Sequence, residues 1–285
     1  MQDKVERVSI IVKPGSLDAL KTANSLAEWL EKRGIKLIGN LIQDEIHGAN
    51  LDSNEIYENA DLLIVLGGDG TILATARRLG RREVPVLGIN YGSLGYLTEF
   101  RIEEVFLALE KVLAGDYEID RRSMLTVELE NELGRETVGR ALNDVVVNKS
   151  VPARIIEIEV CFDEFFVSRF RADGLIVSTP TGSTAYNLSA GGPIIYPSVG
   201  AVVLTPICPF TLTNRPIVIP DSSRIRLRLL EESEGVILTL DGQVFRKITK
   251  GDVIHIHKSS VGFALIKPTS RNYFDVLRNK LKWGS

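Results

Sequence analysis

The chain has 285 residues, of which 44% are hydrophobic and 25% are charged, an ordinary composition for a soluble globular protein. Its 34 basic and 37 acidic side chains leave a net charge of −3, which disfavours a charge-driven nucleic-acid binder. No apolar run reaches the length of a membrane span, no signal-peptide pattern opens the chain, and two cysteines are too few for a disulfide framework. We therefore expect a soluble cytoplasmic protein that binds neither nucleic acid nor membrane.

The first 118 residues alternate strand and helix patterns. Strands are predicted at residues 5–12, 35–38, 62–66 and 84–89. Helices are predicted at residues 17–30, with Ser16 as N-cap, 71–79 and 102–113. The run LLIVL at 62–66 lacks polar alternation, as is typical of a parallel strand buried on both faces. The alternation predicts an α/β domain over residues 1–118, doubly wound around a mostly parallel sheet.

After Tyr117 the helical signals almost disappear. Short β-rich runs separated by turn residues predict an all-β, sandwich-like domain over residues 119–260. Its strands are predicted at residues 125–129, 138–147, 154–162, 165–170, 175–178, 224–229, 236–240 and 253–257. A final segment, residues 261–285, contains a predicted helix at 273–281, which we expect to pack back on the body of the protein.

A glycine-rich turn, GGDGT, occupies residues 67–71 between the buried strand and the next helix. Open α/β sheets bind ligands at the carboxyl ends of their strands, and the N–H groups that begin a helix attract anions. Asp69 would repel a phosphate unless a metal ion or a substrate hydroxyl lies between them. From these five residues alone, a ligand-binding turn and an aspartate that only shapes the turn are equally favoured. The P-loop, the complete GxGxxG pattern and HExxH are all absent.

A second segment, DGLIVSTPTGSTAYNLSAGGP, occupies residues 173–193. Its many hydroxyl groups and glycines suit a polar ligand with several hydrogen-bond acceptors, such as a nucleotide. Tyr186 offers an aromatic face for a base. The alternative is a Ser/Thr-rich loop that satisfies its own turns. His255 and His257 occupy alternate positions of a predicted strand. Side chains that face the pleat or solvent are a better interpretation of this pair than a metal site.

These motifs occur in one order along the chain. GGDGT is followed by the pattern GINxGxLGYL at residues 88–97, by Asn143-Asp144, by the 173–193 segment and by Asp241-Gly242-Gln243. Together they resemble the NAD kinase family over roughly residues 62–245, and the 173–193 segment is the most specific part. GGDGT alone is shared with lipid kinases of the diacylglycerol and sphingosine type and, in looser form, with phosphofructokinases.

The resemblance implies an enzyme that transfers a phosphoryl group from ATP, or another phosphoryl donor, to the 2′-hydroxyl of the adenosine ribose of NAD, giving NADP. It also implies a divalent metal ion, with Mg²⁺ expected, and a homodimer or homotetramer in which subunits share NAD sites. The sequence contains no dedicated carboxylate cage, which suits Mg²⁺ held by the phosphates of the donor and by water, without metal ligands from the protein.

The same resemblance implies roles for the residues at matching positions. Asp69 is the expected catalytic residue, Asn143 and Asp144 match a pair that contacts ribose hydroxyls, and Asp173 matches a carboxylate near the adenine. The full set expected to bind nucleotide is Gly67, Gly68, Asp69, Gly70, Thr71, Asn143, Asp144, Arg154, Arg171, Asp173, Thr181, Thr184, Ala185, Tyr186, Asn187, Leu188, Ser189 and Gln243. Ala74 departs from the family, since many relatives have a basic or histidine side chain there.

Two rival functions stay open. A lipid or small-metabolite kinase with the same GGDGT turn would need a hydrophobic acceptor groove, which the hydroxyl-rich 173–193 segment disfavours. A nucleotide-binding regulator without catalysis would have little reason to keep Asp69 among phosphates.

Overall fold

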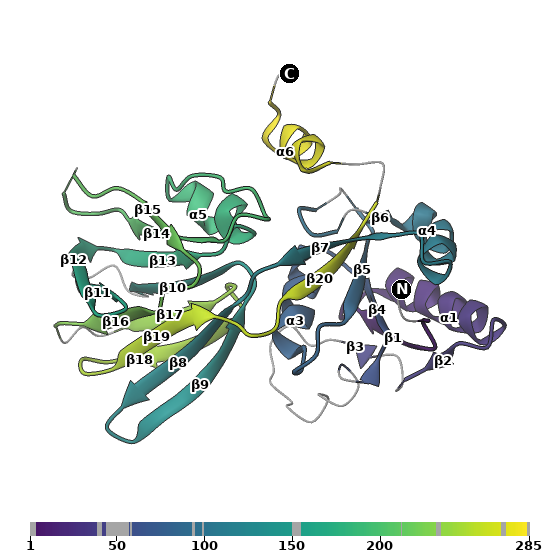
Figure 1. Cartoon of the computed structure of the whole chain (residues 1–285), viewed down its shortest axis with the longest axis horizontal. Coiled ribbons are helices and arrows are strands. Elements are labelled where there is room, and N and C mark those ends of the chain that lie inside the picture. The colour runs from purple at the N-terminus through teal and green to yellow at the C-terminus, as the bar shows by residue number, and fades with distance from the viewer. Residues whose placement is uncertain are drawn as a thin grey trace. The chain divides into compact units, whose positions relative to one another are not determined.

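The structure, a computed structural model, describes residues 4–38, 42–43, 57, 59–92, 95–98, 100–149, 155–211, 213–231, 235–268 and 272–283. The chain divides into two compact units (Figure 1). One is an α/β unit of residues 1–121 and 263–285, and the other is an all-β unit of residues 122–262. None of the described helices is long and apolar enough to cross a membrane.

The α/β unit is built around a sheet with eight strands in its described residues. These strands are β1 (Arg7–Val12), β2 (Lys36–Leu37), β3 (Ile42–Gln43), β4 (Leu62–Leu66), β5 (Pro85–Asn90), β6 (Phe100–Arg101), β7 (Glu118–Arg122) and β20 (Phe263–Lys267). Their order is β2-β1-β4-β5-β20-β7, with β3 beside β1 and β6 beside β5. The pairs from β2 through β4 and β5 to β20 are parallel.

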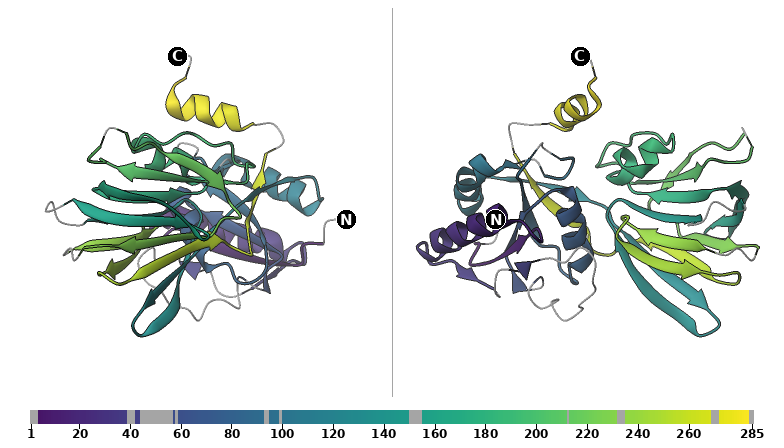
Figure 2. Two further views of the ribbon diagram at one scale, coloured as in Figure 1. Left: turned by 60° about the vertical axis from the view of Figure 1, so that its left-hand side comes forward. Right: turned by 180° about the vertical axis from the view of Figure 1, so that it is seen from behind.

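Helices cover both faces of this sheet (Figures 1 and 2). The helices α1 (Leu17–Glu31) and α4 (Val105–Leu113) share one hydrophobic core with alternate residues of the strands, among them Leu62, Ile64 and Leu66 of β4. The intervening residues of β4 point to the other face, where α3 (Asp69–Arg78) lies. Ser16 caps α1, as predicted, by accepting a hydrogen bond from the Ala19 N–H. The predicted doubly wound α/β arrangement is confirmed.

The chain changes direction across the sheet at β1, because β2 lies on one side of β1 and β4 on the other. The carboxyl ends of β1 and β4 therefore form a topological switch point, where sheets of this kind bind ligands. GGDGT follows β4 at this point. The helix α3 begins two residues earlier than predicted, so that Asp69 belongs to its first turn.

The all-β unit consists of two antiparallel sheets with six described strands each. One sheet has the order β15-β14-β13-β10-β17-β18, and the other has the order β12-β11-β16-β19-β8-β9. Their bounds are β8 (Leu125–Asn131), β9 (Gly134–Ala141), β10 (Asp144–Lys149), β11 (Ile156–Phe162), β12 (Phe165–Ala172), β13 (Gly174–Ser178), β14 (Ala201–Ile207), β15 (Ile217–Pro220), β16 (Ile225–Leu229), β17 (Val236–Leu240), β18 (Val244–Ile248) and β19 (Val253–Lys258). Alternate residues of both sheets form a single core, which confirms the predicted β-sandwich architecture.

Short helical segments complete the two units. The 3₁₀ turn Ile102–Glu104 precedes α4, and the 3₁₀ turn Gly182–Thr184 precedes the four-residue helix α5 (Tyr186–Ser189). The last helix, α6 (Tyr273–Leu281), has the predicted bounds, and Asn272 caps it through a hydrogen bond from the Asp275 N–H.

One strand prediction is wrong. The run 138–147 is two strands, β9 and β10, which are separated by a turn at Leu142 and Asn143. The hydrophobic pattern does not reveal this turn, because Leu142 is an apolar, completely buried residue that continues the run. The strands β3, β6, β7, β14, β15, β18 and β20 were not predicted. Of these, β20 depends on pairing with β5, about 180 residues earlier in the chain, which no local pattern can indicate.

Candidate active site

Asp69 is the first residue of α3 and lies three residues after the end of β4, with Gly68 at the N-cap position of the helix. Its half-buried carboxylate accepts three hydrogen bonds from one short segment. The main-chain N–H of Tyr96 donates to Oδ2 at 2.9 Å, that of Leu97 donates to Oδ1 at 3.1 Å, and the Thr98 hydroxyl donates to Oδ1 at 3.1 Å. The carboxylate is therefore fixed in one orientation at the N-terminus of α3.

The approach of this segment to Asp69 requires glycine at position 95. A Cβ on Gly95 would lie 1.9 Å from Asp69 Oδ1, far inside van der Waals contact. Gly67 is in a similar situation, because a Cβ there would lie 2.3 Å from the Thr71 hydroxyl oxygen. Thr71 is only 2% exposed, so its side chain supports the turn from within. The partly exposed part of GGDGT is residues 68–70.

In the all-β unit, Asp241 holds the turn that carries the predicted ribose-binding pair. Its carboxylate accepts hydrogen bonds from three successive main-chain N–H groups, those of Leu142 at 3.1 Å, Asn143 at 2.8 Å and Asp144 at 3.2 Å. The Asp241 N–H donates in return to the carbonyl oxygen of Asp144 at 2.9 Å. The sequence pattern contains Asp241 only as part of a motif, and the structure gives it an anchoring role.

Asp144 has a buried carboxyl group close to that of Asp241. Asp144 is 4% exposed and Asp241 is 8% exposed. Burial, reinforced by the negative charge of Asp241, raises the pKa of Asp144 to about 7. Asp144 is therefore near the midpoint of its titration at neutral pH, and its protonated form is able to donate a hydrogen bond as well as accept one.

The hydroxyl-rich loop after β13 is tied to the same turn. The Thr179 hydroxyl donates to the carbonyl oxygen of Leu142 at 2.6 Å, and the Thr179 N–H donates to that of Asn143 at 2.9 Å. Gly182 lies so close to the turn that a Cβ there would be 2.1 Å from the Asn143 carbonyl oxygen. These contacts hold the start of the loop against the residues that Asp241 anchors.

Asn187 stabilises the same loop from inside. Its side chain is fully buried, and its amide group donates to the carbonyl oxygens of Ser183 and Pro193, both at 3.0 Å. Its side-chain oxygen accepts a hydrogen bond from the Thr205 hydroxyl at 2.6 Å. Only the main chain of Asn187 is therefore left for the ligand contact expected of it. Four other predicted loop residues are at least partly exposed to solvent, namely Thr184, Ala185, Leu188 and Ser189.

Tyr186, the first residue of α5, is an exposed aromatic side chain of this loop, with 43% of its surface exposed. Burial of the phenol group raises the pKa of Tyr186, and the charges of Cys208, Asp144 and Asp173 raise it further. An exposed ring surrounded by hydrogen-bonding groups suits the base of a nucleotide.

Two predicted site residues, Arg171 and Asp173, lie at the other end of β13. Asp173 directly precedes this strand, whereas Asp144 pairs with its last residue, Ser178. Five residues of extended chain separate these ends by roughly 17 Å. The structure therefore does not bring Arg171 and Asp173 together with the Asn143–Asp144 turn within one copy of the chain.

Both of these residues have partners at their own end of the sheet. Asp173 forms an ion pair with Lys149 at 2.6 Å. The guanidinium group of Arg171 lies over the ring of Phe210, 5.1 Å from its centroid, and the Phe210 N–H donates to the Arg171 carbonyl oxygen at 2.9 Å.

The remaining predicted positions are less informative. Gln243 is half-buried in the turn after β17, and its N–H donates to the Leu240 carbonyl oxygen at 2.9 Å. Thr181 is 6% exposed, and Arg154 lies outside the described residues. Ala74, where many relatives have a basic or histidine side chain, is 3% exposed within α3.

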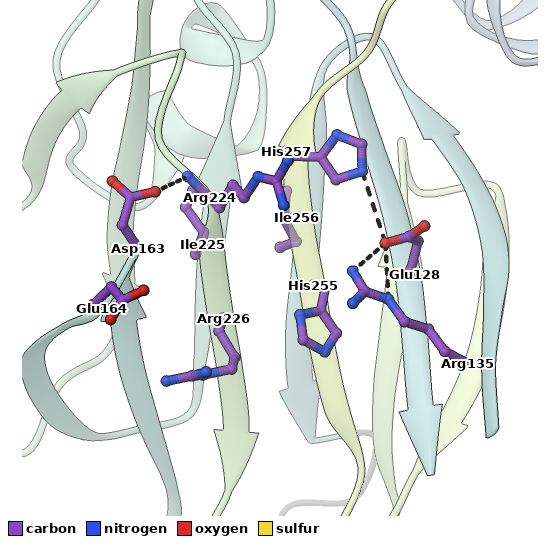
Figure 3. Close-up of a pocket in the computed structure, with 10 residues that line it drawn as sticks. All are labelled: Glu128, Arg135, Asp163, Glu164, Arg224, Ile225, Arg226, His255, Ile256 and His257. Carbon is purple, nitrogen blue, oxygen red and sulfur yellow. Dashed lines mark hydrogen bonds and ion pairs between the residues drawn. The ribbon is translucent and has the colours of Figure 1, made fainter. Parts of the chain in front are cut away.

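A groove of about 480 Å³ lies on the face of β16, β19 and β8 that Figure 3 shows. None of the residues predicted to bind nucleotide lines it. His255 and His257 lie in this groove, with His255 Nε2 2.8 Å from Glu130 Oε2 and His257 Nε2 3.8 Å from Glu128 Oε2. Within the described part of the chain, no group of three or more His, Cys, Asp or Glu side chains converges as a metal site would require.

Comparison with known proteins assigns both units. The family models of the ATP-NAD kinase N-terminal domain and C-terminal domain match residues 8–117 and 142–268. The NAD kinase of Geobacter sp. (strain M21) is 45% identical to this chain over 98% of it and 99% of its own length. The NAD kinase of Solibacter usitatus is 46% identical, with 98% of both chains covered. The chain belongs to the NAD kinase family.

Solved structures of the family have the same fold. The crystal structure of yeast NADH kinase complexed with NADH superposes with a TM-score of 0.88 at 27% identity, covering 100% of this chain and 89% of that chain. An NAD kinase from Archaeoglobus fulgidus in complex with ATP superposes with a TM-score of 0.77 at 28% identity, covering 96% and 98%. The NAD kinase prediction is thus confirmed, and the rival lipid or small-metabolite kinase is not favoured.

Three supporting residues were not predicted from the sequence: Thr98 and Asp241, which contact Asp69 and the Asn143–Asp144 turn, and Asn90, whose side-chain amide donates to the Thr98 hydroxyl oxygen at 2.7 Å. Asn90 and Asp241 belong to motifs that the sequence shows, and their place in those motifs was the available signal. Thr98 directly follows the GINxGxLGYL pattern, and nothing in its local sequence marks it as a partner of Asp69.

The buried Asp144 predicts an unusual dependence of stability on pH. In the unfolded chain this carboxyl has an ordinary pKa of about 3.9. Between that value and about 7, the folded protein keeps a proton that the unfolded chain releases, so the free energy of unfolding falls as the pH rises through this range. Asp144→Asn removes the effect. Denaturant unfolding should show the variant gaining roughly 2–3 kcal/mol relative to wild type between pH 5 and pH 8. A stability difference that is constant with pH would contradict the raised pKa.

Proposed function

We propose that the chain transfers the terminal phosphoryl group of ATP to the 2′-hydroxyl of the adenosine ribose of NAD, and that Asp69 binds and deprotonates this hydroxyl. The observation that carries the proposal is the oriented carboxylate of Asp69 at a helix N-terminus, at the switch point of the sheet, in a chain of the NAD kinase family. The nucleotides in the two neighbour structures, NADH and ATP, are consistent with both substrates.

Phosphoryl transfer demands alignment and charge neutralisation more than covalent chemistry by the protein. The N-terminus of α3, with the positive end of its dipole, suits the phosphates of the donor. Asp69 suits the acceptor, because a fixed carboxylate orients a hydroxyl and takes its proton as the new bond to phosphorus forms. This assigns donor binding and catalysis to the α/β unit.

A divalent metal ion, with Mg²⁺ expected, fits the chain as a partner of the nucleotide. The described residues offer no cluster of three metal-binding side chains, so the phosphate oxygens of the donor and water would hold the ion. When bound, the ion neutralises charge on the phosphates. The orientation of the ribose and the acceptance of its proton are left to residues of the chain itself.

We assign NAD binding to the all-β unit. Asn143 and Asp144, on the turn that Asp241 anchors, face the ribose, and Asp144 in its protonated form donates a hydrogen bond to it. Tyr186 stacks on the adenine. Main-chain and hydroxyl groups supply the remaining contacts, at Thr181, Thr184, Ala185, Asn187, Leu188, Ser189 and Gln243.

We further propose a homodimer or homotetramer that shares NAD sites between subunits. Arg171 and Asp173 lie at the other end of β13 from the Asn143–Asp144 turn. An assembly brings these two ends to one NAD molecule if each is supplied by a different copy. Arg154 belongs to the same proposed set by its position in the family pattern. The cytoplasmic location expected from the sequence stays a prediction.

Replacing the proposed catalytic carboxylate should stop turnover without unfolding the protein. Asp69→Asn should lower kcat for NADP formation by about 10²–10⁴-fold, because the amide accepts no proton, while the affinity for NAD changes little. Asp18→Asn, which also changes a first-turn aspartate of a helix but one that is exposed, is the matched control and should keep wild-type activity. An NAD analogue that lacks only the 2′-hydroxyl should bind and not be phosphorylated. Its phosphorylation at any position would contradict the assignment.

The aromatic ring of Tyr186 should contribute binding energy for NAD. Tyr186→Ala should weaken binding by roughly 1–3 kcal/mol, the scale of a lost stack between a base and an aromatic ring. Tyr186→Phe keeps the ring and should bind NAD within a few-fold of wild type. Calorimetric titration with NAD measures both variants. Equal affinity of Tyr186→Ala and wild type would remove the stacking role and leave the kinase assignment intact.

The assembly should be visible in solution. Light scattering of the active enzyme at micromolar concentration should give two or four times the 31.5 kDa mass of one chain. Arg171→Ala and Asp173→Ala should then raise KM for NAD in the assembled enzyme. An active species with the mass of a single chain would exclude shared sites.

A further inference from the structure

A chain of hydrogen bonds leads from the end of β5 to Asp69. Asn90, the last residue of β5, donates from Nδ2 to the Thr98 hydroxyl oxygen at 2.7 Å. Thr98 in turn donates to Asp69 Oδ1 at 3.1 Å. Thr98 is completely buried and Asn90 is 9% exposed, so these hydrogen bonds are shielded from solvent. The proposed mechanism makes no use of either residue.

The direction of this chain is determined by one main-chain group. The Gly92 N–H points to the other end of the Asn90 side chain at 2.9 Å, and an N–H is able only to donate. The acceptor there must be Oδ1 of Asn90, which directs the NH₂ group to Thr98. Because the Thr98 oxygen accepts from Asn90, its single proton is left for Asp69.

Counting acceptor positions distinguishes the two oxygens of Asp69. An ionised carboxylate has about four lone-pair positions, two on each oxygen. Oδ1 accepts from both the Leu97 N–H and the Thr98 hydroxyl, so its positions are filled. Oδ2 accepts only from the Tyr96 N–H among the described residues. One acceptor position on Oδ2 therefore stays open.

We propose that Asn90 and Thr98 are positioning residues, which act through Asp69 by occupying Oδ1 and leaving Oδ2 as the atom that accepts the proton of the substrate hydroxyl. The inference rests on the proposed function and names the reacting atom within it. As the ribose oxygen forms its bond to the terminal phosphorus of ATP, the bond from that phosphorus to the bridging oxygen breaks, and its electron pair leaves with ADP. The hydroxyl proton moves to Oδ2.

The hydrogen bonds from Asn90 to Thr98 and from Thr98 to Asp69 keep the carboxylate of Asp69 in one orientation. A carboxylate bonded by fewer donors rotates about its χ2 torsion and presents either oxygen, or neither, to the substrate. Two donors on Oδ1 and one on Oδ2 stop that rotation and keep the open position of Oδ2 in one direction. A misplaced catalytic group lowers the rate of the chemical step without weakening the binding of substrates held elsewhere.

The test removes the Thr98 hydroxyl while keeping the shape of the side chain. Thr98→Val should lower kcat by about 10- to 100-fold, the scale of losing a hydrogen bond to a charged group. KM for NAD and KM for ATP should stay within about twofold, because neither is proposed to contact Thr98. Thr98→Ser restores the donor and should recover most of the lost kcat. A structural role alone predicts neither this division between kcat and KM nor this recovery.

The matched control is Thr75→Val. Thr75 is also a completely buried threonine of the α/β unit, but its hydroxyl donates to the Thr71 carbonyl oxygen at 2.9 Å, away from the Asp69 carboxylate. Its kcat should equal that of wild type, and thermal unfolding of both valine variants measures the cost of the substitution itself. Equal loss of kcat in Thr75→Val and Thr98→Val would overturn the proposal.

Asn90→Ala tests the direction of the chain and also serves if Thr98→Val fails to fold. Without the donor, the Thr98 proton is no longer directed to Asp69, so kcat should fall by about 3- to 10-fold. In a chain that already carries Thr98→Val, the same change should have less than a twofold effect, because the two residues act in series. Independent, multiplying effects would overturn the series. Unchanged kcat in Thr98→Val, with NADP still formed, would overturn the inference alone, whereas a wild-type protein that forms no NADP would overturn the proposed function.

Discussion

Main-chain N–H groups hold two aspartates, one in each unit of the chain. Asp69 accepts from Tyr96 and Leu97, and Asp241 accepts from three successive N–H groups of the 142–144 turn. Such donors are fixed by the backbone and carry no positive charge. These bonds therefore fix the orientation of each carboxylate through the backbone itself. Each aspartate in turn fixes the loop that surrounds it.

This arrangement explains the contrast between the two acidic groups of the all-β unit. Asp241 receives three hydrogen bonds as an acceptor, and Asp144, with its main-chain N–H used by Asp241, has its own carboxyl group buried beside that charge. Because their surroundings differ, the carboxyl groups of Asp241 and Asp144 are suited to different roles. Asp241 anchors the turn, whereas Asp144 changes its protonation near neutral pH and is the proposed hydrogen-bond donor to the ribose.

The sequence predicted most of the fold and part of the site, for physical reasons that differ between residues. Buried strands such as β4 and capped helices such as α1 carry local patterns, and GGDGT marks the switch point directly. The two-strand structure of 138–147 was missed because Leu142 continues the apolar run through a turn. Thr98 meets Asp69 only through folding, 29 residues along the chain, so its role has no local signal. The separation of Asp173 from Asp144 likewise depends on strand register, which a list of family positions does not contain.

The return of the chain to its first sheet has a consequence for synthesis. The strand β20, residues 263–267, lies between β5 and β7, so β7 has no place in the sheet until β20 is present. A ribosome delivers the whole all-β unit before it delivers this strand, and domains fold as units while the chain emerges. The sandwich is thus free to fold first, as an insert within an incomplete α/β sheet. The sheet beside which Asp69 lies is then closed by the last of the described strands to be translated, so the α/β unit is completed only after the whole all-β unit has been made.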